Sequence, residues 1–148
     1  MNITPEKEQS IREKFATNHF TRMLGFEIDS VEPGRAVLSV EVRKDLTQLQ
    51  GVMHGGATAA LFDTAVAFAI LGGSESGARF TTVEMKVNYL RPISEGRVTA
   101  EARLIRDGRR IVVAECDVHD AAGKLAAKGL LTYIRLDDQA ENSAGLPQ

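Results

Sequence analysis

The sequence predicts an α+β fold in which one long central helix is wrapped by a strongly curved, six-stranded antiparallel sheet. The first observation is a run of 16 mostly small and apolar residues, from Gly56 to Leu71, that contains one charge, Asp63. A helix that is apolar on every side is buried. The second observation is that the flanking segments alternate between polar and apolar residues, as half-buried strands do. A curved sheet covers such a helix on most sides only, so a second subunit is a natural cover for the rest.

The segment before the central helix is expected to contribute a short helix and two strands. Thr4 suits an N-cap position, and Glu6 and Glu8 suit the positive end of a helix dipole. The expected elements are a helix over Pro5–Asn18, a strand that follows residues 23–26 and ends near Val31, a turn over 32–35 and a strand over 36–42.

The segment after the central helix is expected to form four strands in an antiparallel meander. Gly72 and Gly73 give the helix a C-cap signal, and Asp107–Gly108 is a two-residue hairpin signal. The expected strands are Phe80–Leu90, Val98–Ile105, Ile111–Val118 and Leu125–Leu136. Residues 137–148 are polar, so we expect one domain, 1–136, followed by a C-terminal tail.

The composition narrows the classes of function. The net charge of −2 and the lack of a basic helix or zinc-finger spacing argue against a nucleic-acid partner. The apolar run is shorter than the about 20 residues that span a bilayer and carries a carboxylate, so no membrane partner is expected. The polar N-terminus is unlike a targeting signal. A single cysteine, Cys116, excludes an internal disulfide and is expected in the core of a strand, in a cytoplasmic protein.

Motifs for metals, phosphate loops and other cofactors are missing from the sequence. The three histidines lack metal-ligand spacing, and no glycine pattern typical of a phosphate-binding loop is present. We therefore expect neither a metal nor a cofactor. The candidate residues that remain are Gln48, His54, Gly55 and Asp63.

The start of the central helix, His54-Gly55-Gly56, is a candidate oxyanion site. The first N–H groups of a helix have no acceptor within the helix and lie at its positive end, and glycine lets a substrate approach the backbone closely. A thioester carbonyl could accept a hydrogen bond from Gly55 N–H, a contribution of about 2.7–4 kcal/mol to transition-state stabilisation. The alternative for His54 is that its ring only caps the helix or holds the Gln48 loop.

Asp63 is the second candidate, because a buried acid is costly unless it is paired or used. It follows Gly55 by eight residues, about 12 Å along a helix, so one carbonyl cannot touch both positions of the same helix. Two antiparallel helices of a two-fold dimer would pair Asp63 of one subunit with Gly55 of the other. Asp63 could then act as nucleophile or as general base. The alternative is a structural acid that accepts hydrogen bonds from a neighbouring loop.

Three features together resemble the PaaI-like hotdog-fold acyl-CoA thioesterases. They are the motif G-x-x-H-G-G at residues 51–56, the aspartate nine residues after its histidine, and the strand TTVEMKVNYLRP at residues 81–92. The resemblance covers roughly Leu24 to Leu136. It implies the hotdog fold, homodimers that pair into homotetramers, and hydrolysis of an acyl-CoA thioester to free acid and coenzyme A, which belongs to the substrate.

The resemblance also implies a role for each candidate residue. Asp63 corresponds to the family's catalytic carboxylate, and Gly55 to the backbone donor to the thioester carbonyl, with His54 beside it. Gln48 occupies the position of an Asn or Gln near the attacking water, and Thr82 that of a hydroxyl that assists this water. Asp63 is expected to come from one subunit and the residues around Gly55 from the other.

Coenzyme A carries phosphates, so basic side chains are expected near its site. The resemblance assigns the nucleotide to two regions, which contain Tyr89, Arg91, Arg106, Arg109 and Arg110. The alternative for the three hairpin arginines is that they form a solvated hairpin tip.

Two other functions on the same fold stay open. One is a non-catalytic acyl-CoA sensor, which usually adds a DNA-binding segment; the other is a dehydratase or hydratase, whose chemistry the glycine-rich helix start fits less well.

Overall fold

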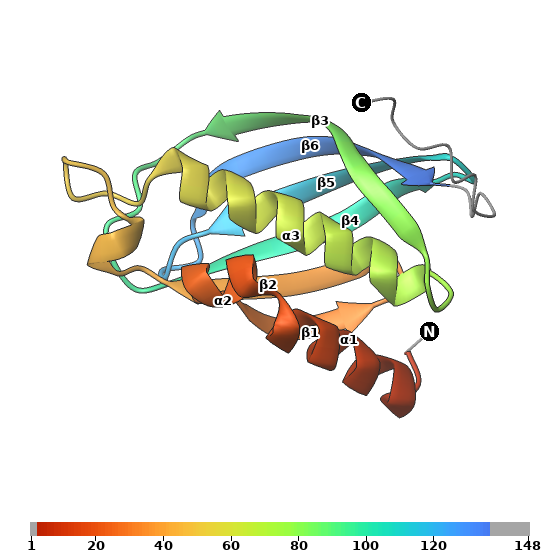
Figure 1. Ribbon diagram of the computed structural model, residues 1–148. Coiled ribbons are helices and arrows are strands. Elements are labelled where there is room, and N and C mark those ends of the chain that lie inside the picture. The colour runs from red at the N-terminus through yellow and green to blue at the C-terminus, as the bar shows by residue number, and fades with distance from the viewer. Residues whose placement is uncertain (1–2, 137–148) are drawn as a thin grey trace, which may run out of the picture.

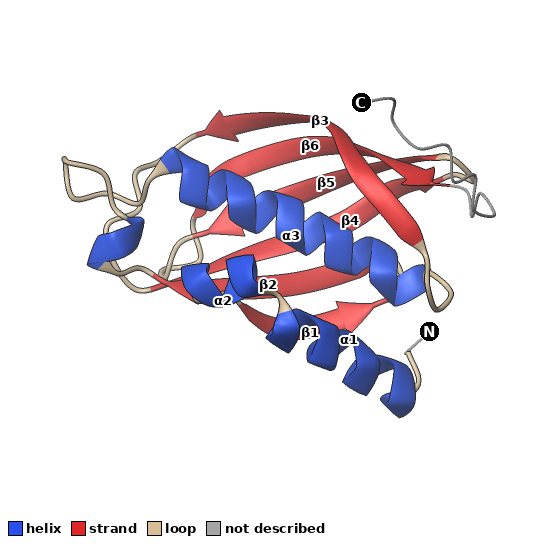
Figure 2. Ribbon diagram, viewed as in Figure 1, coloured by secondary structure: helices blue, strands red, loops and turns tan. Residues whose placement is uncertain are grey.

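The structure, a computed structural model, describes residues 3–136. Figures 1 and 2 show α3 lying along one face of a curved sheet, with the two short helices α1 and α2 beside it. In chain order the elements are α1 (Pro5–Thr17), α2 (His19–Leu24), β1 (Glu27–Glu32), β2 (Arg35–Glu41), a 3₁₀ turn (Lys44–Leu46), α3 (Gly55–Gly73), β3 (Arg79–Tyr89), β4 (Arg97–Asp107), β5 (Ile111–His119) and β6 (Leu125–Leu136).

The predicted architecture of a long helix against a six-stranded antiparallel sheet is confirmed. The strand order is β1-β2-β4-β5-β6-β3, and all neighbours are antiparallel. The predicted meander is wrong for β3, which pairs with β6 and not with β4. Both sides of β4 are taken by β2 and β5, so β3 uses the free side of β6 and becomes an edge of the sheet.

The core lies between α3 and the inner face of the sheet. On β5, Val112, Ala114, Cys116 and Val118 alternate along the strand and are fully buried. The prediction that Cys116 is a core residue is confirmed, and burial raises the pKa of its thiol. Because the thiolate is the reactive form, Cys116 is expected to be inert. The buried residues of α3 are Ala57, Thr58, Leu61, Phe62, Ala65, Val66, Phe68, Ala69, Ile70 and Gly72.

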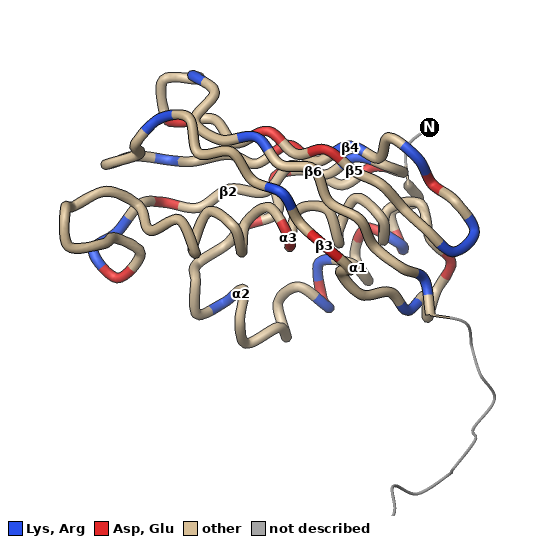
Figure 3. Tube along the Cα trace, turned by 90° about the horizontal axis from the view of Figure 1, so that it is seen from above, with Lys and Arg blue, Asp and Glu red and all other residues tan. Residues whose placement is uncertain are grey.

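One stripe of α3 is left open by the sheet. Its residues recur every three or four positions and are half-buried or exposed: Gly56, Ala59, Ala60, Asp63, Thr64, Ala67 and Leu71. Figure 3 shows that charges follow the strands and loops, whereas α3 is almost free of them. The sheet of the single chain therefore covers α3 on most sides only, as expected. The expected gap in the cover exists, and Asp63 lies in it.

The sequence analysis did not predict α2 and expected only that residues 23–26 lead into the first strand. The Asn18 side chain caps the start of α2 by accepting from the backbone N–H groups of Phe20 and Thr21. At its end Gly25 adopts a left-handed conformation with φ 75°. The Arg43 guanidinium donates to the last carbonyls, Leu24 O at 2.7 Å and Met23 O at 2.6 Å. That arginine is distant in sequence, so local patterns could not show its contribution.

α3 ends at Gly73, as the Gly72-Gly73 pair predicted, but the C-cap is Ser74, in an extended conformation, and neither glycine. Gly72 instead permits a close contact between α3 and the turn after β1. A Cβ at position 72 would lie 2.2 Å from the carbonyl oxygen of Glu32. The Lys7 ammonium on α1 donates to Gly72 O and Ser74 O at 2.7 Å each, which satisfies carbonyls that the helix end leaves free.

α3 is the one helix within residues 3–136 that is long and apolar enough, by length and composition alone, to cross a membrane. Of its large side chains, Leu61, Phe62 and Ile70 are fully buried within this fold. Packing against the sheet therefore accounts for its apolar composition.

Replacing Gly72 with Ala should lower the free energy of unfolding by about 1–3 kcal/mol, the usual cost of overpacking. Gly73→Ala is the matched control, because a Cβ there has its nearest neighbour at 3.7 Å. Its stability should equal or exceed that of the wild type, since Ala favours helix more than Gly does. Urea unfolding followed by circular dichroism measures both variants, and equal stabilities would contradict the proposed contact.

Candidate active site

The start of α3 presents one free backbone donor. Gly55 is the first helical residue and His54 is the N-cap, whose Nδ1 accepts from Gly56 N–H at 2.8 Å. The N–H groups of Ala57 and Thr58 donate to His54 O. Within residues 3–136 the Gly55 N–H has no acceptor, so it is the donor of this turn that is available to a ligand.

The ring of His54 caps the helix, which is the alternative role that the sequence analysis left open for this residue. Because Nδ1 accepts a hydrogen bond, that nitrogen carries no proton, and the neutral ring has its proton on Nε2. His54 is exposed. The cap fixes the peptide groups of the first turn, and Nε2–H is left as a second donor beside Gly55.

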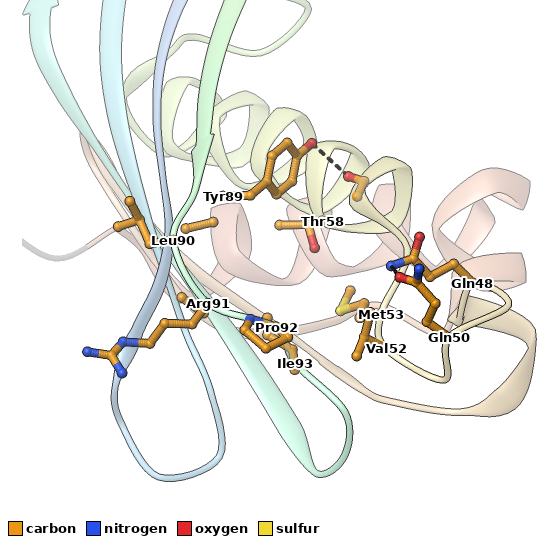
Figure 4. Close-up of a pocket in the computed structure, with 13 residues that line it drawn as sticks. Gln48, Gln50, Val52, Met53, Thr58, Tyr89, Leu90, Arg91, Pro92 and Ile93 are labelled. Atoms are coloured by element: carbon orange, nitrogen blue, oxygen red, sulfur yellow. Dashed lines mark hydrogen bonds between the residues drawn. The ribbon is translucent and has the colours of Figure 1, made fainter.

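A cavity of about 460 Å³ opens beside this helix start (Figure 4), a size usual for small-molecule sites. Four predicted site residues line it together: Gln48, Gly55, Tyr89 and Arg91. Tyr89 Oη donates to Gly55 O at 2.9 Å, the contact drawn in Figure 4. A Cβ at position 55 would lie 3.3 Å from the Tyr89 ring, so the tyrosine also favours glycine there. Gln48 is exposed on the loop and its amide N lies 3.4 Å from Gln50 Oε1.

Asp63 lies on the open stripe of α3 and is held by two hydroxyl groups. Thr82 Oγ1 on β3 donates to Asp63 Oδ1 at 2.7 Å. Tyr133 Oη on β6 donates to the same oxygen at 2.6 Å and also lies 2.7 Å from the backbone O of Asp63. Within residues 3–136, Oδ2 of Asp63 has no hydrogen-bond partner. The structure thus brings the predicted site residues Asp63 and Thr82 into contact.

Tyr133 was missed by the sequence reasoning, although a signal was present. It follows Leu131 at an inward position of β6, where its hydroxyl needs a polar partner in the core. Burial, and secondly the hydrogen bond to Asp63, raise the pKa of Tyr133 above its ordinary value. The phenol therefore keeps its proton for the hydrogen bond to Asp63 up to a higher pH than an ordinary tyrosine does.

The remaining predicted residues lie at the other end of α3. Arg106, Arg109 and Arg110 belong to the hairpin between β4 and β5, and the side chain of Asp107 in this hairpin approaches Gly73 at the end of α3. Within residues 3–136 the three arginines form no ion pair. One chain therefore does not bring them to the cavity beside Gly55. No three His, Cys, Asp or Glu side chains of the described part of the chain converge as a metal site.

Comparison with known families matches residues 50–127, more than half of the chain, to the thioesterase superfamily. The chain belongs to this superfamily. A thioesterase family protein from Silicibacter pomeroyi is 32% identical, with a TM-score of 0.81 over 88% of this chain and 98% of that one. A mutant structure of the phenylacetic acid degradation protein PaaI from Thermus thermophilus is 34% identical, with a TM-score of 0.73 over 80% and 100%. Human acyl-coenzyme A thioesterase 13 is 29% identical over 131 residues, 86% of this chain and 93% of the relative.

The resemblance to PaaI-like hotdog thioesterases is confirmed by these matches. The protein is a thioester hydrolase with the hotdog fold, in which the six-stranded sheet wraps the central helix. The superfamily match includes the start of α3 and the whole of that helix, with Gly55 and Asp63, whereas Gln48 and Tyr133 of this thioesterase lie outside the matched residues.

The phenol of Tyr133 should stay un-ionised at a pH well above about 10, where an unperturbed tyrosine titrates. The chain has two tyrosines, so Tyr89→Phe leaves Tyr133 as the single reporter. Ultraviolet absorbance of the phenolate should show no step before alkaline unfolding. Since only the unfolded chain would lose this proton between its own pKa and the higher pKa of the folded state, stability should fall as pH rises above about 10. A reversible step near pH 10 in folded protein would contradict the buried hydrogen bond.

Proposed function

We propose that this thioesterase hydrolyses an acyl-CoA thioester to a free acid and coenzyme A. The observation that carries the proposal is the Asp63 carboxylate, supported by two hydroxyls and reachable on the open stripe of α3. A free N–H at the start of the same helix lines a cavity of suitable size. The name of the human relative, acyl-coenzyme A thioesterase 13, supports the substrate class.

We further propose a two-fold dimer with two equal sites across the interface. Gly55 and Asp63 are eight residues apart on one helix, about 12 Å, too far for both to act on one carbonyl. The open stripe of α3 lies near the edge strand β3, whose Val83 and Met85 are 56% and 37% exposed. Burying such apolar side chains favours association. A second copy with an antiparallel α3 would cover the stripe and supply the missing half of each site.

In this arrangement Gly55 N–H of one subunit polarises the thioester carbonyl, and His54 Nε2–H lies beside it as a further donor. Asp63 of the other subunit either takes a proton from a water that attacks the carbonyl carbon, or attacks that carbon itself through Oδ2. Thr82 and Gln48 would orient the water. Collapse of the tetrahedral intermediate breaks the carbon–sulfur bond, and the thiolate of coenzyme A leaves and is protonated. On the general-base route this step releases the free acid. On the nucleophilic route it leaves a mixed anhydride on Asp63, which a water then hydrolyses to the free acid and the restored carboxylate.

The coenzyme A moiety is proposed to follow Tyr89 and Arg91 out of the cavity. In an antiparallel dimer the hairpin of the partner, with Arg106, Arg109 and Arg110, would approach the helix start of the first subunit. These guanidinium groups have no internal acidic partner within residues 3–136 and suit phosphate. Pairing of dimers into tetramers and a cytoplasmic location are part of the same proposal. The rival hypothesis is a non-catalytic acyl-CoA-binding protein, and the next experiments distinguish it from the proposed hydrolase.

Asp63→Asn should reduce kcat by about 10²–10⁴-fold, the usual contribution of a general base, while the fold is kept. Gly55→Pro should also inactivate the enzyme, because proline is tolerated at the first helical position but removes the N–H. Gly55→Ala is the matched control, because its added methyl group makes a tight contact with the Tyr89 ring but the backbone N–H donor is retained. Hydrolysis is followed by thiol release from aromatic, short, medium and long acyl-CoAs.

Heterodimers of Asp63→Asn and Gly55→Pro subunits, purified through two different tags, should regain about half of the wild-type activity, since one of two equal sites is intact. Stable heterodimers without activity would reject the cross-subunit site. Near-normal turnover by Asp63→Asn would reject the role of the carboxylate, and wild-type protein that binds acyl-CoAs without hydrolysis would favour the sensor.

Replacing Arg106, Arg109 and Arg110 together with Ser should raise KM for acyl-CoA at least about ten-fold with little change in kcat, because a charge-assisted hydrogen bond is worth about 1.5–3 kcal/mol. The effect should shrink at high salt. Lys14→Ser on the exposed side of α1 is the control for lost surface charge. Unchanged KM in the triple variant would assign these arginines to a solvated hairpin tip.

A further inference from the structure

We propose that Tyr133 is a positioning residue that fixes the orientation of the Asp63 carboxylate, so that Oδ1 is held and Oδ2 is the reactive atom. The inference rests on the proposed catalytic role of Asp63. Both hydroxyls that reach this carboxylate, Tyr133 Oη and Thr82 Oγ1, meet at Oδ1. Two donors occupy the two lone-pair directions of one oxygen, which leaves the other oxygen to receive a proton from water or to attack carbon.

The two donors form a directly opposed pair on neighbouring strands. Thr82 of β3 and Tyr133 of β6 are register partners in the sheet, and directly opposed residues place their side chains on the same face. That face lies toward α3, since both hydroxyls reach Asp63 on this helix. The two hydroxyls therefore hold the Asp63 carboxylate from the sheet side, and Oδ2 is left on the side away from both hydroxyls.

Tyr133 is the more rigid of the two donors. It is 2% exposed, and its strand is paired on both sides, with β5 and with β3. Its ring meets Phe80 edge to face with the centroids 5.9 Å apart. Thr82, by contrast, lies on the edge strand, half-buried and next to a register shift between Thr82 and Glu84. The Thr82 hydroxyl can therefore rotate toward a water, whereas the Tyr133 phenol is held in one orientation.

The phenol also ties the side chain of Asp63 to its own backbone. Its single proton has two acceptors, Oδ1 at 2.6 Å and the backbone carbonyl of Asp63 at 2.7 Å. A carboxylate is the stronger acceptor, so the proton goes to Oδ1. Contact with both oxygens still restricts the side-chain torsions of Asp63. A carboxylate held within about 10–20° of its productive orientation keeps its reactivity, and one that rotates freely loses it.

Tyr133→Phe tests this role, because it removes the hydroxyl and keeps the ring against Phe80. We expect kcat to fall about ten- to hundred-fold, the worth of a hydrogen bond to a charged group, with KM changed less than about two-fold. Thr132→Val is the matched control on the same strand. This change also removes a hydroxyl that donates to a carboxylate, since Thr132 Oγ1 lies 3.0 Å from Glu84 Oε1, but this pair lies on the opposite face of the sheet. The kcat of Thr132→Val should equal that of the wild type.

A second measurement separates positioning from a structural role. If Tyr133 acts through Asp63, adding Tyr133→Phe to Asp63→Asn should cost no further activity, whereas independent effects would multiply. Circular dichroism and the mass of the assembly establish that each variant is folded. Folded Tyr133→Phe with wild-type kcat, or a loss that multiplies with that of Asp63→Asn, would overturn the inference. If Asp63→Asn itself retained activity, the proposed function would fail instead, so the two failures are distinct.

Discussion

The close approach of α3 to the sheet is the constraint on which the rest of the molecule depends. Small side chains allow it, and at close-packed interfaces a single added methyl group is felt. At Gly129 on β6 a Cβ would lie 3.0 Å from the Phe62 ring, and at Gly72 it would meet the turn after β1. A helix seated this deeply is enclosed on all sides but one. The buried alanines between the two layers are Ala57, Ala65 and Ala69 on α3 and Ala36, Ala100, Ala102 and Ala114 on the strands.

The helical period then decides what can happen on the open side. Asp63 shares its stripe with Ala60 and Ala67, whose small side chains leave the carboxylate reachable. Because α3 lies so near the sheet, inward-pointing hydroxyls of β3 and β6 reach that carboxylate from below. The same packing thus leaves Asp63 reachable on the open stripe and supplies the hydrogen bonds that a half-buried charge requires. The hydroxyls of the sheet hold the carboxylate on one side, and its other side stays accessible.

Much of this was predictable from the sequence, since it rests on local patterns. The apolar run located α3, alternation located the strands after it, and the motif around Gly55 located the helix start. The features that were missed depend on contacts between distant segments. The last carbonyls of α2 accept hydrogen bonds from Arg43. β3 pairs with β6 because both sides of β4 are occupied by β2 and β5. Tyr133 donates to Asp63, which lies 70 residues away in the chain. The predicted tail, residues 137–148, lies outside the described residues.

Each α3 carries Gly55 for one proposed site and Asp63 for the other, so one rigid helix links the two sites. Gly55 and Asp63 cannot move relative to each other without breaking α3, so the geometry of each site would depend on how two helices align across the dimer. In the proposed dimer that alignment would be set by the stripe of α3 and by the edge of β3. Residues of the proposed interface that touch no substrate, such as Val83 and Met85, would then influence catalysis by shifting one half of the site against the other. Sub-ångström shifts of this kind matter, because reacting groups must be held within about 0.5 Å of productive geometry.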